Sequence, residues 1–229
     1  MGAAAAGEVL NVEDVFSTYL YQGTSANQTI TNSIDLSEGG LVWVKGRPNA
    51  GYSHGLYDTE RGVTKRLASN ETSAESTYAN SVTAFNNNGF SLGSDGNGEA
   101  NYSGSTYVSW TFRKAPKFFD VVTYTGNGAT SRQIAHDLGA TPGMIIVKIT
   151  SEAGGWAVYH RGNTANPETD KLRLDSTAAT VDANDYWADT SPTSTHFTIG
   201  SDGDVNQNAA TYVAYLFAHN DGDGEFGPD

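Results

Sequence analysis

The chain has 229 residues, a formal net charge of −13 and no cysteine. The charge argues against nucleic acid as a ligand, because phosphate binding needs a basic patch. The lack of cysteine excludes disulfides and thiolate metal sites, and no apolar stretch is long enough to cross a bilayer, so we expect no membrane partner. Abundant Gly, Ser, Thr, Asn and aromatic residues, with no sustained 3.6-residue period, predict an all-β fold.

Much of the chain occurs twice, as an internal duplication with the same segments in the same order. The matching segments are residues 41–45 and 144–148, 90–96 and 197–203, and 106–112 and 211–217. We therefore expect two tandem β-sandwich domains, of the jelly-roll or lectin-like kind, each of about 100 residues.

The duplication fixes the expected domain plan. A flexible N-terminal arm is expected at residues 1–14, the first sandwich at 15–113 and the second at 120–219. Residues 114–119 form a linker so short that the two domains should touch. The basic trio Arg113, Lys114 and Lys117 is interpreted as a solvated part of this linker. Residues 220–229 are an acidic tail that we expect to lead into further chain.

In chain order, each copy is expected to supply seven extended segments and no strong helix. Segment 41–45 and its counterpart 144–148 are apolar on both faces, which is typical of a strand buried in a sandwich. The last two segments, separated by a short polar loop, are predicted to form a hairpin. The segments are 15–21 and 121–124, those around Ile30 and Ile134, 41–45 and 144–148, 54–57 and 156–159, 67–72 and 172–177, 90–96 and 197–203, and 106–112 and 211–217.

In the closing segment of each copy, every second residue is large and apolar. We assign the face formed by these residues to the core. We expect the following six residues to point into the two sandwiches: Val108, Trp110, Phe112, Val213, Tyr215 and Phe217. The residues between them, such as Ser109 and Ala214, are small, as facing positions in a packed sandwich often are.

Catalytic patterns are not found in the sequence. The five histidines lie in no nucleophilic motif, and there is no G-x-S-x-G elbow. Glycoside hydrolysis needs two carboxylates at a set separation. Candidates are Glu60, Glu71, Glu75, Asp175 and Asp185, but Glu60 has no acidic counterpart in the second copy. We therefore predict that the protein is not an enzyme and has no cofactor.

Three Asp-Gly loops are the only candidates for a metal site. They are residues 95–97, 202–204 and 221–223, and none matches the spacing of a calcium loop. Because Asp and Gly both favour tight turns, turn formation explains these loops and we predict no bound metal.

Aromatic residues in loop-like contexts are the candidates for stacking on a sugar. These are Trp187, Tyr186 and Tyr52. A function specific to one copy would be expected in the stretches that differ between the copies. They are residues 52–66 against 153–171, and 78–88 against 182–195.

Several segments also carry a family resemblance. In the second copy they include YTGNG (124–128), IAHDLGATPG (134–143), WAVYHR (156–161), SPTST (191–195) and TYVAYLFAH (211–219), and in the first copy residues 14–21 and 109–114. Together they resemble a repeated module of bacteriophage virion proteins, common in marine phages and prophages and described as tail-fibre-like or lectin-like. No catalytic residue comes with the resemblance.

The resemblance implies a virion structural protein, of the tail fibre or tail spike class, that serves attachment and recognises a host glycan. Its expected location is the virion, and its expected partners are other virion proteins and a cell-surface glycan. By analogy with phage fibres it would be a homotrimer. A capsid decoration protein is the alternative, and a carbohydrate-active enzyme is the second alternative.

Overall fold

The structure is a computed structural model that describes residues 11–47 and 51–219. Over these residues the fold is all-β with antiparallel sheets, which confirms the fold class expected from composition. Helix is confined to single turns. These are α1 (Val12–Val15), α2 (Asn184–Trp187), α3 (Gly203–Asn206) and the 3-10 turns Leu36–Glu38 and Pro167–Thr169.

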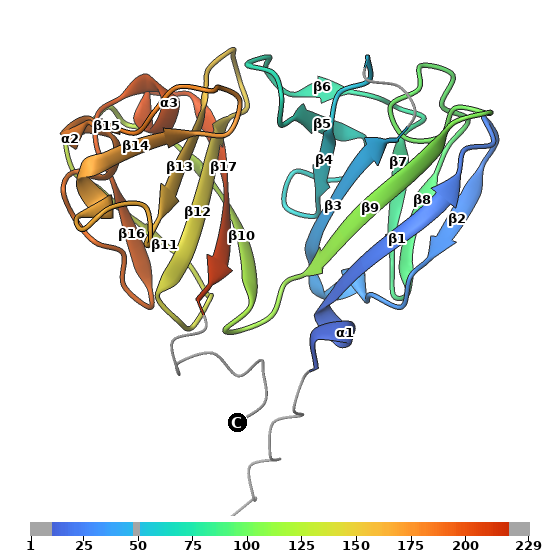
Figure 1. Cartoon of the computed structure of the whole chain (residues 1–229), viewed down its shortest axis with the longest axis horizontal. Coiled ribbons are helices and arrows are strands. Elements are labelled where there is room, and N and C mark those ends of the chain that lie inside the picture. Colours follow the sequence, from blue (N-terminus) through green and yellow to red (C-terminus); the bar gives the residue numbers. More distant parts are fainter. Residues whose placement is uncertain (1–10, 48–50, 220–229) are drawn as a thin grey trace, which may run out of the picture.

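Two six-stranded sheets form the framework, one in each half of the chain (Figure 1). The first half contains, in sheet order, β1 (Phe16–Gln22), β9 (Thr106–Arg113), β3 (Gly40–Gly46), β4 (Gly55–Asp58), β5 (Lys65–Ala68) and β6 (Ser76–Thr77). The second half contains β10 (Phe119–Thr125), β17 (Thr211–Ala218), β12 (Pro142–Ile149), β13 (Trp156–His160), β14 (Asp170–Arg173) and β15 (Val181–Asp182). In both sheets the first strand lies beside the last, followed by the third to sixth strands of that half.

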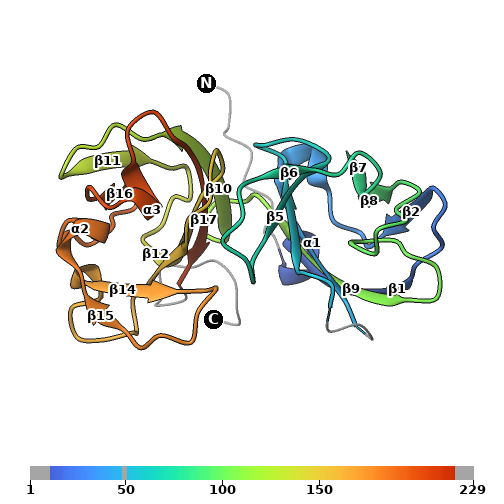
Figure 2. The ribbon, with the colours of Figure 1, turned by 90° about the horizontal axis from the view of Figure 1, so that it is seen from above.

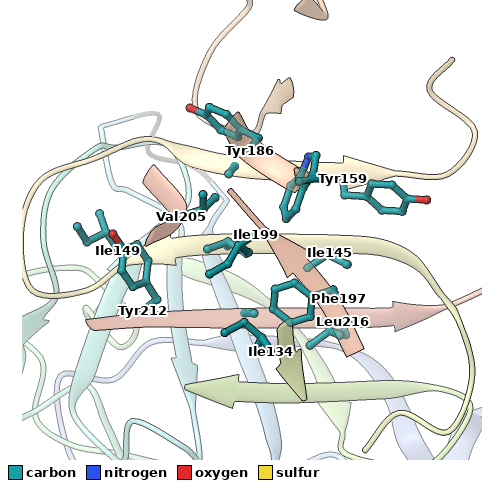
Figure 3. Packing of buried hydrophobic residues seen from close by; sticks show 14 of the residues in the cluster. Ile134, Ile145, Ile149, Tyr159, Tyr186, Phe197, Ile199, Val205, Tyr212 and Leu216 are labelled. Atoms are coloured by element: carbon teal, nitrogen blue, oxygen red, sulfur yellow. The ribbon is translucent and has the colours of Figure 1, made fainter. Parts of the chain in front are cut away.

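A smaller sheet covers one face of each large sheet. It consists of β2 (Gln28–Thr31), β8 (Gly89–Leu92) and β7 (Val82–Asn86) in the first half, and of β11 (Arg132–Ala135) and β16 (His196–Ile199) in the second. An apolar cluster fills the space between the sheets, around Val42 and Phe90 in the first half and around Val147 and Phe197 in the second. Each half is therefore a β-sandwich, and Figure 3 shows the second of these cores.

The predicted hairpin between the last two strands of each copy is wrong. β8 pairs with β2 and β7, whereas β9 pairs with β1 and β3. Likewise β16 pairs with β11, and β17 with β10 and β12. The polar loop therefore carries the chain from the small sheet across to the large one, and a strand–loop–strand pattern alone does not distinguish this crossing from a hairpin.

The predicted inward face of the closing strands is also wrong. On β9 it is Tyr107 that joins the core of the first sandwich, and on β17 Tyr212 and Leu216 join that of the second. The residues expected there, such as Val213 and Tyr215, are buried on the opposite face of the sheet. They belong to a third apolar cluster that lies between the two halves.

This third cluster is the seam, where the outer faces of the two large sheets meet (Figure 2). Strands β3, β4 and β5 contribute from the first half, and β10, β12, β13 and β17 from the second. Its buried residues are Leu41, Leu56, Leu67, Phe119, Val121, Ile146, Trp156, Val158, Val213 and Tyr215. Because apolar area on both sheets is removed from water here, the seam stabilises the pairing of the halves, and the expectation that they touch is confirmed.

The segment between the halves is more firmly held than a solvated linker. Lys114 forms an ion pair with Asp120 at 2.9 Å, and the Asp120 side chain is 1% exposed. Ala115 forms a β-bridge with Phe119. The interpretation of Lys114 as a solvated linker residue is therefore wrong.

The last residues of the expected arm belong to a helix. Residues 12–14, assigned to the arm from the sequence, belong to α1, because the Asn11 N–H donates to the Asp14 carboxylate at 2.8 Å and closes the first turn. Residues 1–10 and the acidic tail 220–229 lie outside the described residues.

The two halves close their last loop in the same way. Asn101 Nδ2 donates to the Gly93 carbonyl at 2.7 Å, and Asn206 Nδ2 donates to the Gly200 carbonyl at 2.9 Å. Both asparagines are 0% exposed. A buried amide that satisfies carbonyls of separate loops fixes those loops relative to one another.

A pair of stacked tyrosines accompanies each asparagine. Tyr21 and Tyr107 stack with ring centroids 5.3 Å apart, and Tyr124 and Tyr212 with centroids 5.0 Å apart. The hydroxyl of each closing-strand tyrosine donates to a carbonyl of the preceding loop, at 3.0 Å in the first half and 2.7 Å in the second. The two halves thus share the order of strands in the large sheet, the buried asparagine and the stacked tyrosine pair.

Candidate functional site

Two of the three aromatic residues expected to bind sugar are buried. Tyr186 is 0% exposed and Trp187 is 2% exposed. The one-turn helix α2 directs both into the second core, where Trp187 meets Tyr159 edge-on with ring centroids 6.0 Å apart. The prediction that Tyr186 and Trp187 stack on a glycan is therefore wrong, because no face of either ring is accessible.

Tyr52, the third candidate, lies partly buried against the first half. A Cβ atom at Gly98 would fall 2.2 Å from the Tyr52 ring, so the ring lies directly over that glycine. The backbone of Tyr52 is held as well, since Lys45 Nζ donates to its carbonyl at 2.8 Å. A stacking role for Tyr52 stays a prediction.

A pocket of about 560 Å³ opens instead beside Tyr159 in the second half. Its charged groups are Arg161, which follows β13, and Glu168, which lies in the second 3-10 turn. Three prolines also line it, namely Pro142, Pro167 and Pro192. Most of this lining comes from residues 153–171 and 182–195, stretches in which the second half differs from the first.

Tyr159 connects this pocket to the core. Its side chain is 5% exposed, and Figure 3 shows its hydroxyl directed away from the buried cluster. Burial raises the pKa of the Tyr159 hydroxyl, the negative charge of Glu168 raises it further, and the positive charge of Arg161 opposes them. The three groups are therefore electrostatic neighbours, and the tyrosine is a neutral hydroxyl at physiological pH.

The loop that carries the pocket wall is tied down. The Asp170 carboxylate, 8% exposed, accepts hydrogen bonds from Asn163 Nδ2 at 3.1 Å and from the Thr164 hydroxyl. The backbone N–H of Arg161 donates to the Gly143 carbonyl at 2.9 Å. The wall is therefore preformed.

The first half uses the corresponding residues differently. Tyr57 is 0% exposed. Arg61, which like Arg161 precedes a glycine, turns inward, and its Nε lies 2.6 Å from the Asp58 carboxylate. Tyr215, from the second half, donates its hydroxyl to the same carboxylate at 2.7 Å, and Glu75 pairs with Arg61 at 3.1 Å. This buried network crosses the seam.

Lys148 is a second polar group buried at the seam. Its Nζ donates to the carbonyls of Thr72 at 3.2 Å, and of Ile149 and Gly154 at 3.0 Å each. Thr72 belongs to the first half, so the lysine joins the halves. Burial lowers its pKa to about 8 despite the charges of Asp175 and Asp204.

Three of the five carboxylates considered for hydrolysis form contacts that hold the fold in place, namely Glu71, Glu75 and Asp175. Glu71 accepts from the hydroxyls of Ser53 and Ser73, and Asp175 accepts from the backbone N–H of Trp156 at 3.1 Å. Glu75 belongs to the seam network. Glu60 and Asp185 are exposed.

The two described Asp-Gly loops are turns held by their aspartates. Asp95 accepts from the backbone of Asn97 at 2.9 Å and of Ala100 at 2.7 Å, and Asp202 from Asp204 at 2.7 Å. In residues 11–47 and 51–219 no group of three His, Cys, Asp or Glu side chains is placed to hold a metal. The third loop, 221–223, lies outside the described residues.

Comparison with known proteins adds a family. The profile of a domain of unknown function, DUF7483, matches residues 11–228. The chain belongs to the DUF7483 family. Its profile spans both halves, so the DUF7483 unit contains the two sandwiches together.

Searches of curated proteins and of solved structures found no significant match. Within the described part of the DUF7483 chain, no helix is long and apolar enough to span a membrane.

The sequence did not single out Tyr159, Arg161, Glu168, Lys148 or the Arg61 network. Two signals were present. One is the difference between the two halves around residues 153–171, and the other is a lysine placed in an otherwise apolar strand at 148.

Proposed function

We propose that this DUF7483 chain is a structural protein of a bacteriophage virion, of the tail fibre or tail spike class, and that it serves attachment without being an enzyme. The observation that carries the proposal is the double sandwich itself: two units of one plan, joined by a buried seam into a single block. A fibre must transmit force between its ends. Two sandwiches that pack face to face transmit force better than two sandwiches joined by a flexible linker. The sequence resemblance supplies the phage setting.

We also infer that the two sandwiches arose by internal duplication. Support comes from the shared sheet order, from the buried asparagines Asn101 and Asn206, and from the paired tyrosine stacks. An independent origin would have to reproduce these details at matching positions. Whether the sandwiches are of the jelly-roll or lectin-like kind belongs to the same proposal.

Other virion proteins and a cell-surface glycan are the proposed partners, and a homotrimer is the proposed assembly. An edge strand favours assembly: β1 is the outer strand of its sheet, and Leu20 on it is 58% exposed. Sedimentation equilibrium of the purified chain tests the trimer, and a monomer at micromolar concentration would contradict it.

Labelling of intact particles tests the function. Gold-conjugated antibodies raised against the chain should decorate the tail in electron micrographs. Label spread over the capsid lattice would favour the decoration protein instead, and absence of label would reject a virion role. Reducing-sugar release from host surface polysaccharide tests the enzyme alternative, and we expect none.

A further inference from the structure

We propose that the Tyr159 pocket binds a neutral saccharide, which makes it the glycan-recognition site of the second sandwich. The inference rests on the proposed attachment function and deepens it by giving that function a site. The residues expected from the sequence to stack on a sugar, Tyr52, Tyr186 and Trp187, do not line this pocket.

The pocket has the size and preorganisation that a small ligand needs. A volume of about 560 Å³ lies within the range of roughly 300–1,000 Å³ usual for small-molecule sites. Pro142, Pro167 and Pro192 line it, and proline fixes φ and offers no N–H donor. Asp170 holds the loop that contributes Arg161 and Glu168. Little ordering entropy remains to be lost when a ligand enters.

The polar groups suit a hydroxylated and uncharged ligand. Arg161 supplies several N–H donors, Glu168 supplies acceptors, and the Tyr159 hydroxyl can do either. Adjacent hydroxyl groups of a pyranose both donate and accept, so they match a donor and an acceptor placed side by side. The apolar CH groups of the sugar ring would pack on the prolines.

Charge argues against the other ligand classes. An anionic saccharide would be repelled by Glu168 and by a chain of net charge −13. A cationic ligand would be repelled by Arg161. The opposite charges of Arg161 and Glu168 leave the pocket close to neutral.

The first half provides an internal comparison. Its tyrosine at the matching strand position, Tyr57, is fully buried, and Arg61 is turned into the seam network with Asp58. These two residues therefore serve the fold in the first copy, while Tyr159 and Arg161 line an open pocket in the second. The binding function is assigned to the second sandwich alone.

The test is saccharide binding by the full chain and by three variants of the pocket. The probes are an array of neutral and sialylated oligosaccharides, followed by titration with methyl galactoside, methyl glucoside and methyl mannoside monitored by NMR. We expect neutral probes to bind, and Arg161→Ala and Glu168→Gln to weaken binding at least tenfold. Tyr159→Phe keeps the ring and its packing, and should weaken binding less.

Matched controls use exposed residues of the first half. Arg47→Ala and Glu38→Gln remove the same groups from exposed positions and should leave binding unchanged. The proposal is overturned if no neutral probe binds, if sialylated probes are preferred, or if Arg161→Ala and Glu168→Gln bind like the unmodified chain. Label on the phage tail without saccharide binding would reject this site alone, whereas saccharide binding without label on the particle would reject the virion role.

Discussion

The two halves of the chain place a tyrosine and then an Arg-Gly pair at the end of the fourth strand, and use them in opposite ways. In the first half Arg61 is buried and joins Asp58 to Tyr215 across the seam. In the second half Arg161 lines an open pocket beside Tyr159. Three residues lie between Tyr57 and Arg61 in the first half, whereas a single residue lies between Tyr159 and Arg161 in the second. A small difference in loop length thus accompanies a difference in the role of the arginine. Arg61 is buried in the seam, whereas Arg161 lines a pocket.

The two halves also differ in which of their contacts are shared. The asparagine and tyrosine contacts that close the last loop occur in both halves, so they belong to the fold. The seam is different, because each half contributes unlike residues to it. Variants of the common contacts should therefore behave alike in the two halves, and variants of the seam should not.

The largest effect is expected at the seam. Asp58→Asn removes the charge that faces Arg61, whose side chain is 4% exposed, and leaves the guanidinium under-compensated. Removing one partner of a buried ion pair costs about 3–5 kcal/mol, and we expect that loss in the free energy of unfolding by urea. Asp182→Asn, at an exposed strand position, is the control. A loss below about 1 kcal/mol would show that the network does not hold the halves together.

The next effect is expected at two glycines that match between the halves. A Cβ at Gly23 would lie 2.2 Å from the Tyr102 carbonyl oxygen, and one at Gly126 would lie 2.1 Å from that of Gln207. Because backbone must move to relieve the clash, each Gly→Ala variant should lose about 2–3 kcal/mol of stability, measured by urea unfolding. Gly96, with open space around it, is the control. If only one of the two variants is destabilised, the loops are not equivalent.

A somewhat smaller and equal effect is expected at the buried asparagines. Asn101→Ala and Asn206→Ala each leave loop carbonyls without a donor, and each should cost about 2 kcal/mol in the free energy of unfolding. Asn184→Ala, at an exposed position, should cost much less. Calorimetry of the three variants measures these losses of unfolding free energy. Losses for Asn101→Ala and Asn206→Ala that differ by more than about 1 kcal/mol would argue against a shared role.

The sequence predicted most strands because their aromatic and β-branched residues stand between turns that occur twice. It placed Tyr215 in the wrong cluster because both faces of the closing strand are apolar, one for the sandwich and one for the seam. It took Trp187 for a loop residue because a one-turn helix leaves no periodic pattern. Arg161 and Glu168 come to line one pocket only through the fold, so the difference between the two halves indicated their region but not the residues.

The smallest effect is expected from pH, and it tests how Lys148 differs from an ordinary surface lysine. Its folded-state pKa of about 8 lies below the unfolded value of about 10.4. Between these values the unfolded chain binds more protons than the folded chain, so the stability of the folded state rises with pH.

Lys148→Met removes that titration while keeping an unbranched side chain in the strand. From pH 7 to 9.5 the unmodified chain should therefore gain about 1–2 kcal/mol of unfolding free energy relative to the variant. Urea unfolding at a series of pH values measures the difference, and other titrating groups cancel from it. A difference that stays constant would mean that Lys148 retains its proton as readily in the seam as in water, and that its three carbonyl contacts offset the cost of its burial.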